Sequence, residues 1–334
     1  MARLGLFVKV YVFRALQCIF TYLDIYCSAP TPARATFKRK VPSTFDKKPG
    51  NIGLLFYTPT SYTQPHKTSP HPILINFHGG GFTIGNAYDD ARWAQAVTQT
   101  TDAVVISVDY RRAPECPFPI GIEDCVAAVL WIWEHASALN LDPSRTALSG
   151  FSAGGTFAYS VAIRLQEELE LRKKNDLSSA LVTGKLVGLT SFYPSTDWTM
   201  TREERDASNP NLIPVIPKSL FRVFEESYFF PARTRESMKD PLLSPAFASD
   251  EILKAALPDS TALIMCSGDQ LLHEQVQFME RLRGLGKTVE DYTLPNTGHA
   301  WDKQPSFRKG NASRDAAYAM AIKSLQASWA VPNV

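Results

Sequence analysis

Short apolar runs alternate with amphipathic stretches along most of this 334-residue chain. The runs are typical of strands in a parallel sheet, which is covered on both faces. The expected strands cover residues 73–77, 103–108, 146–149, 186–192 and 262–266, with a further strand-like stretch at 289–294. The stretches with helical periodicity cover residues 91–99, 122–136, 154–171 and 272–284. This alternation predicts an α/β fold with a mostly parallel sheet and helices on both faces.

Two segments depart from the alternation. Residues 194–245 are rich in Pro, Arg and aromatic side chains and indicate an inserted cap. Residues 4–26 are strongly apolar, but polar residues interrupt them within one arc of about 140° on a helical wheel. The predicted organisation is an N-terminal amphipathic helix and cap segment over residues 1–50, followed by one α/β domain over residues 51–334.

The N-terminal stretch is a poor signal peptide or membrane span because charges such as Lys9 and Arg14 interrupt it. An apolar helix face is covered by its own domain, by a bilayer or by another subunit. The polar side offers Lys9, Arg14, Gln17, Thr21 and Asp24, which is a weak complement to anionic lipid. We therefore expect the apolar face to pack on its own domain near the active site, with peripheral membrane contact as the alternative.

Charge and cysteine content exclude several classes of function. The 35 basic and 33 acidic residues nearly balance, and the short cluster 38–40 is expected to be a solvated loop, so no nucleic acid is expected as a partner. The five cysteines are scattered without metal-type spacing. They are typical of reduced thiols in a cytoplasmic protein, although one disulfide is compatible with the sequence.

A G-x-S-x-G motif lies between a predicted strand and a predicted helix, at residues 150–154. In this context the motif forms a sharp turn that exposes the serine hydroxyl at the edge of the sheet. Gly150 and Gly154 are needed because the turn leaves no room for flanking side chains. The sequence thus predicts Ser152 as a nucleophile.

A serine nucleophile requires a base, and the base requires an acid that orients it. The order expected for this motif is Ser, acid, His. His299 lies in a loop after the last predicted strand, whereas His273 lies in a helical stretch and is expected at the surface. Asp269 follows the predicted strand 262–266. Asp291, within a strand, and Glu274, on a helix, are the weaker candidates for the acid.

Three consecutive glycines, residues 79–81, follow a predicted strand and His78. Ester cleavage by a serine builds negative charge on the carbonyl oxygen, and unshielded N–H groups stabilise it. We expect Gly79, Gly80 and Ala153 to donate these N–H groups, with Gly81 leaving room for the approach. His78 is expected to brace this loop.

The motifs, in this order and spacing, resemble those of the hormone-sensitive-lipase family of α/β hydrolases over roughly residues 50–330. They are HGGGF at 78–82, DYRRAPECPFP at 109–119, GFSAGG at 150–155, GDQLLHE at 268–274 and GHAW at 298–301. The resemblance implies the α/β-hydrolase fold, a carboxylic ester hydrolase without metal or cofactor, and a cap built from the N-terminus and the insertion. The stretch YPSTDWTMTREER is also similar to fungal members, some of which act on acylated secondary metabolites.

Two residues depart from the family pattern. Phe151 stands where the family usually has Asp, and Arg112 where it often has Leu. Tyr110, Arg111 and Glu115 are expected to hold the loop beneath the glycines.

The predicted reaction is a two-step acyl transfer on a small or medium hydrophobic ester. The alternatives are an amidase such as a formamidase, an acyltransferase or thioesterase, and a non-catalytic receptor. Gly81 disfavours the first, because related amidases usually carry a bulky aromatic residue there. The presence of His299 disfavours the receptor. A set of aromatic residues in the insertion either lines a substrate pocket or packs a cap helix: Trp198, Phe221, Phe224, Tyr228, Phe229 and Phe230.

Overall fold

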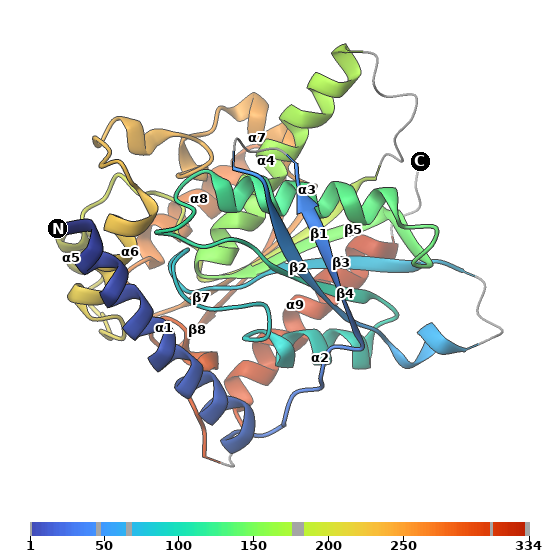
Figure 1. The fold of residues 1–334 in the computed structure, drawn as a ribbon, viewed down its shortest axis with the longest axis horizontal. Helices are drawn as coiled ribbons and strands as arrows, with labels where there is room; N and C mark the ends of the chain where they lie inside the picture. Colours follow the sequence, from blue (N-terminus) through green and yellow to red (C-terminus); the bar gives the residue numbers. More distant parts are fainter. Residues whose placement is uncertain (1, 45–47, 65–68, 176–183, 308–309, 331–334) are drawn as a thin grey trace.

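A single eight-stranded sheet organises the computed structural model, which describes residues 2–44, 48–64, 69–175, 184–307 and 310–330 (Figure 1). The strand order is β1-β2-β4-β3-β5-β6-β7-β8. β2 is antiparallel to β1 and β4, and every other neighbouring pair is parallel. The strands are β1 (Phe37–Ser43), β2 (Gly50–Tyr57), β3 (His71–Phe77), β4 (Val104–Asp109), β5 (Leu141–Phe151), β6 (Leu186–Phe192), β7 (Ser260–Cys266) and β8 (Thr288–Leu294).

The six predicted strands are all present, and the predicted α/β fold with a mostly parallel sheet is confirmed. β1 and β2 were not predicted. The basic cluster 38–40, expected in a loop, lies instead in β1, where its side chains are exposed at the edge of the sheet. Charged side chains on an edge strand oppose pairing with another chain.

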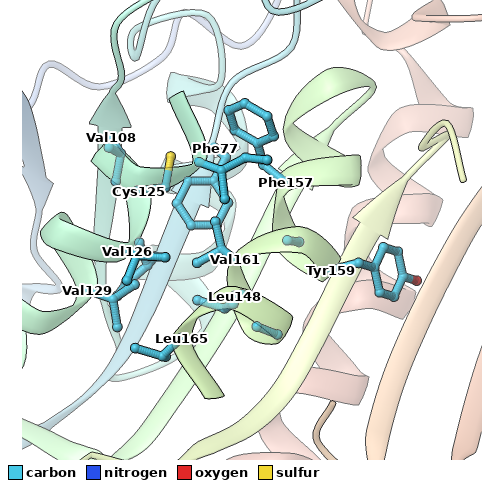
Figure 2. Close-up of a cluster of buried hydrophobic side chains, with 14 of the residues drawn as sticks. Phe77, Val108, Cys125, Val126, Val129, Leu148, Phe157, Tyr159, Val161 and Leu165 are labelled. Atoms are coloured by element: carbon cyan, nitrogen blue, oxygen red, sulfur yellow. The ribbon is translucent and has the colours of Figure 1, made fainter. Parts of the chain in front are cut away.

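Helices cover both faces of the sheet. One face carries α3 (Ile120–Glu134), α4 (Ala153–Lys174), α7 (Asp250–Ala256) and α8 (Leu272–Gly284). The other face carries α2 (Ala91–Thr100) and α9 (Ala312–Ala330). Figure 2 shows how side chains from α3 and α4 gather over the sheet, with Val126 and Phe157 near Phe77 and Leu148. The strands are apolar on both sides because each side meets such a helical layer.

The predicted insertion, residues 194–245, contains two short α-helices. α5 (Arg202–Ser208) begins with a capping box, in which Thr201 and Glu204 satisfy each other's backbone N–H groups. α6 (Lys218–Tyr228) carries Phe221, Phe224 and Tyr228 at helical spacing on its buried side. The aromatic residues of α6 are buried and pack on Trp198 and on the domain beneath them, where Tyr228 stacks on Phe82.

α1 (Ala2–Cys27) forms the expected helix and lies on its own domain, but its orientation differs from the expectation. Its polar side faces the domain. Arg14 Nη1 and Nη2 pair with the two carboxylate oxygens of Glu115 at 2.7 and 2.8 Å, and Asp24 forms a buried ion pair with Arg92. These charge-assisted bonds fix which side of the helix turns inward.

The opposite side of α1 is exposed, and we call it the outer face. It consists of Leu4, Val8, Tyr11, Val12, Leu16, Ile19, Phe20, Tyr22 and Tyr26. A smaller apolar contact joins α1 to α6 through Leu6, Val10 and Val223. Most of the apolar surface of the helix therefore remains uncovered by the chain.

Candidate active site

Ser152 lies at the sharp turn between β5 and α4. Its backbone has φ 52° and ψ −117°, a conformation that non-glycine residues rarely adopt. The turn is too tight for side chains at its two glycines. A Cβ on Gly150 would lie 2.1 Å from the Gly154 carbonyl oxygen, and one on Gly154 would lie 2.0 Å from the Phe77 carbonyl oxygen. The Ser152 N–H donates to the Phe192 carbonyl at 2.8 Å, which ties the strained residue to β6.

A chain of hydrogen bonds joins Ser152 to His299 and Asp269. Ser152 Oγ lies 2.7 Å from His299 Nε2, and His299 Nδ1 lies 2.7 Å from Asp269 Oδ2. The second carboxylate oxygen of Asp269 accepts the Leu271 N–H at 3.1 Å. His299 and Asp269 are both buried, so the carboxylate acts on the imidazole with little screening by water.

The weaker candidates lie away from this chain of bonds. Asp291 is exposed on β8, where Arg283 binds it at 2.6 Å. Glu274 is buried beneath the insertion and pairs with Arg205 at 3.1 Å. His273 is exposed on α8, as expected.

The glycine loop turns close to Ser152. A Cβ on Gly79 would lie 2.9 Å from the Phe151 carbonyl oxygen and 3.5 Å from Ser152 Cβ. Gly80 has φ +108°, and a Cβ there would lie 2.3 Å from the Ile84 carbonyl oxygen. In the part of the chain that the structure describes, the N–H groups of Gly79 and Gly80 donate to no other residue. The loop thus has two unpaired backbone donors, and Gly79 lies against Ser152.

His78 and Tyr110 hold the base of this loop. Their rings stack with centroids 4.1 Å apart, and Tyr110 Oη donates to the His78 carbonyl at 2.8 Å. Burial, reinforced by the nearby Arg112, lowers the pKa of His78 to about 3, so the ring is neutral near pH 7.

The other two residues expected to support the loop act elsewhere. Arg111 binds Asp124, and Glu115 binds Arg14 of α1. Arg112, a departure from the family pattern, instead donates to the Gly85 carbonyl within the loop.

A buried charged cluster behind the turn was not predicted from the sequence. Lys303 pairs with Asp90 at 2.7 Å and with Asp302 at 3.2 Å, and its Nζ lies 3.9 Å from the centroid of the Phe151 ring. Burial lowers the pKa of Lys303, but Asp302 and Asp90 outweigh it and leave the pKa well above its ordinary value. The family's usual Asp at position 151 is thus replaced by an aromatic face over a lysine.

This cluster reaches His299 through one tyrosine. Tyr193 Oη donates to Asp302 Oδ1 at 2.5 Å, and the Tyr193 ring meets the His299 ring edge-on with centroids 4.8 Å apart. The signal in the sequence was the position of Asp302 and Lys303, three and four residues after His299. The sequence did not show that Lys303 pairs with Asp90, because Asp90 is distant in the sequence.

Aromatic side chains of the insertion border the glycine loop. A Cβ on Gly81 would lie 2.3 Å from Phe224 Cδ2, so Phe224 occupies the space that Gly81 leaves open. Phe82 stacks on Tyr228 with centroids 3.9 Å apart and lies 5.9 Å from Trp198. Among the described residues there is no group of His, Cys, Asp and Glu that could hold a metal ion.

The comparisons with known proteins agree with one another on the family. A family profile described as an alpha/beta hydrolase fold matches residues 74–303. Esterase LipI of Mycobacterium tuberculosis is 31% identical over 79% of this chain and 75% of its own length. Lipase 2 of a Moraxella species is 27% identical over 78% of this chain. The match covers 61% of the length of that lipase. The solved structure of a bacterial heroin esterase superposes with a TM-score of 0.76 at 25% identity, covering 97% of this chain and 93% of that one.

Proposed function

The chain belongs to the alpha/beta hydrolase family and is an enzyme of the carboxylesterase and lipase type, and we propose that Ser152, His299 and Asp269 form its catalytic triad. The observation that carries this proposal is the pair of 2.7 Å contacts from Ser152 Oγ to His299 Nε2 and from His299 Nδ1 to Asp269 Oδ2. This arrangement is what a serine nucleophile needs for activation.

The first half of the reaction forms an acyl-enzyme. His299 Nε2 takes the hydroxyl proton while Ser152 Oγ bonds to the carbonyl carbon of the ester. The C–O bond to the alcohol then breaks, and the protonated His299 gives that proton to the leaving alcohol oxygen. Asp269 holds the imidazole in the tautomer that accepts from Ser152 and stabilises the imidazolium.

The second half releases the acid. His299 takes a proton from water, the resulting hydroxide attacks the acyl carbon, and the proton returns to Ser152 Oγ as the acyl–serine bond breaks. In both halves the carbonyl oxygen becomes negative. The N–H groups of Gly79, Gly80 and Ala153 are the proposed donors to this oxygen, each worth about 3 kcal/mol in the transition state.

We propose a small or medium hydrophobic ester, such as an acylated secondary metabolite, as the substrate. The support is the aromatic border of the glycine loop, where Phe224 lies over Gly81 and the neighbouring Phe82 meets Trp198. These side chains favour an apolar acyl or alcohol group over a charged one.

A substrate panel tests this function directly. Activity is measured on p-nitrophenyl esters of increasing acyl length, alongside an anilide and a thioester. We expect turnover of the esters with a preference for short or medium chains. Faster turnover of the anilide or the thioester would contradict the proposal and favour an amidase or a thioesterase.

Covalent labelling tests the nucleophile. An organophosphonate ester should phosphonylate Ser152, which mass spectrometry of the peptide containing it detects. Ser152→Ala should lose the label and lower kcat by several orders of magnitude. Ser160→Ala is the matched control, because Ser160 is buried on α4 and donates to the Thr156 carbonyl of its own helix. Labelling that persists in Ser152→Ala would refute the assignment.

A further inference from the structure

The outer face of α1 is an unusual surface for a folded domain. Its side chains include Leu4 and Tyr22, which are 72% and 61% exposed, and they extend along a helix of about 39 Å. Figure 1 shows α1 along the outer edge of the molecule, with the domain on one side only. A contiguous apolar patch of this length indicates an interaction surface.

The charged side chains of α1 and of the groove beside it indicate which kind of partner the outer face binds. Within α1, Asp24 is buried against Arg92, whereas Lys9 is exposed. An open groove of about 750 Å³ lies beside the helix and is lined by Arg14 of α1 and by the basic residues 38–40 of β1. The groove also contains Glu115, which Arg14 pairs, and Asp109. The groove lies on the side of α1 that carries Arg14, and its lining holds six basic residues and two acidic ones. Exposed basic side chains such as Lys9 and Lys40, together with an apolar helix face, are the combination that binds anionic lipid.

We propose that the outer face of α1 docks this enzyme onto an anionic bilayer surface, with the helix lying in the plane of the interface. Tyr11, Tyr22 and Tyr26 suit this position because their rings are apolar and their hydroxyls reach water at the level of the headgroups. Residues 38–40 then approach the phosphates and carboxylates of the lipid headgroups from the adjacent groove.

Two other arrangements fit the observations less well. The stretch Arg3–Cys27 is long and apolar enough to cross a bilayer, and only 11% of its most apolar window is buried. A crossing helix would, however, have to break the ion pairs of Arg14 with Glu115 and of Asp24 with Arg92. A second copy of the chain, docked symmetrically on the same face, would present the same basic residues and, among the described residues of the groove, no acidic patch to complement them.

Vesicle sedimentation of the full chain tests the proposal. The probes are vesicles of phosphatidylcholine alone and of phosphatidylcholine mixed with phosphatidylserine. We expect the protein to pellet with the mixed vesicles and to be released by alkaline carbonate, as a peripheral protein is. The measurement is repeated on Ser152→Ala, which should bind equally well, so the result does not depend on the proposed triad.

Matched substitutions locate the surface. Ile19→Asp on the outer face should weaken binding about tenfold or more, because an apolar anchor is replaced by a charge. Val276→Asp, at an exposed apolar position on α8, should leave binding unchanged. Lys40→Gln should weaken binding to the mixed vesicles about fivefold without affecting binding to phosphatidylcholine. Circular dichroism checks that each variant is folded.

Three results would overturn the proposal. One is wild-type protein that remains in the supernatant with the mixed vesicles. Another is resistance to carbonate, which would indicate a spanning helix. The third is a solution mass of two chains that Ile19→Asp reduces to one, without any binding to vesicles, which would make the outer face a dimer interface.

Discussion

At the scale of single residues, the two carboxylates near the end of the sheet have different surroundings. Asp269 is buried and lies 2.7 Å from His299 Nδ1, whereas Asp291 is exposed and bound to Arg283. We predict that Asp269→Asn lowers kcat/KM by about 10³- to 10⁴-fold, because the imidazole loses the group that fixes its tautomer. Steady-state kinetics on a p-nitrophenyl ester measures this. Asp291→Asn is the control and should stay near wild type; the reverse result would show that the wrong acid was assigned.

Gly80 is a second residue whose substitution has a specific expected effect. Its φ of +108° and the nearby Ile84 carbonyl oxygen leave no place for a Cβ, so a side chain must displace the loop. We predict that Gly80→Val lowers kcat by about 10²- to 10³-fold through loss of the proposed oxyanion donors. Gly286→Val is the matched control, since Gly286 also has a positive φ, +86°, with no atoms within 4 Å of its Cβ position. Equal kcat values in the two variants would contradict a role for the loop.

At the scale of elements, Asp89 connects α1 to the glycine loop. Its carboxylate accepts from Thr21 at 3.0 Å and from the Asn86 N–H at 3.1 Å. Burial and, next, the charge of Asp90 raise the pKa of Asp89 to about 6, although Asn86, Thr21 and Lys303 oppose this. Ionising Asp89 therefore costs more free energy in the folded chain than in the unfolded chain.

This raised pKa predicts a pH-dependent stability. The stabilisation is complete below the unfolded pKa of about 4 and is lost as the pH rises towards 6. Between pH 4 and pH 7 the wild type should lose about 2 kcal/mol of unfolding free energy relative to Asp89→Asn, allowing for its partial exposure to solvent. Urea unfolding of both proteins across this range measures the difference. If the unfolding free energies of the two proteins change with pH in parallel, Asp89 does not titrate as described.

The sequence predicted elements well where burial on both faces made them apolar. Strands such as β6 and β7, and the helix α8, are recognisable from their own residues. β1 was missed because its first half is basic and exposed, so that only its pairing with β2 makes it a strand. The prediction of which face of α1 turns inward was wrong for a related reason. A helical wheel identifies two faces, but here Glu115 and Arg92, distant in the sequence, decide which face turns inward.

At the scale of the whole molecule, the topology assembles the site. β3, β5, β7 and β8 are parallel, so the residues that follow their carboxyl ends meet at one edge of the sheet. Gly79, Ser152, Asp269 and His299 all follow such ends. This convergence could be predicted from the order of strands and motifs. The Lys303 cluster could not, because its pairing with Asp90 joins a loop after β8 to the residue preceding α2.

In the whole molecule, a buried ion pair attaches α1 to the rest of the domain. Arg92 and Asp24 are 7% and 6% exposed, and Arg92 also donates to the Pro30 carbonyl at 2.8 Å. We predict that Asp24→Ala lowers the unfolding free energy by about 3–5 kcal/mol, because it leaves the Arg92 charge buried without its carboxylate. The double variant Asp24→Ala/Arg92→Met should be clearly less destabilised than that single variant, since it removes the stranded charge as well. Urea unfolding of the wild type, both single variants and the double variant measures this coupling. Strictly additive losses would mean that α1 is held to the domain by its other contacts and not by this pair.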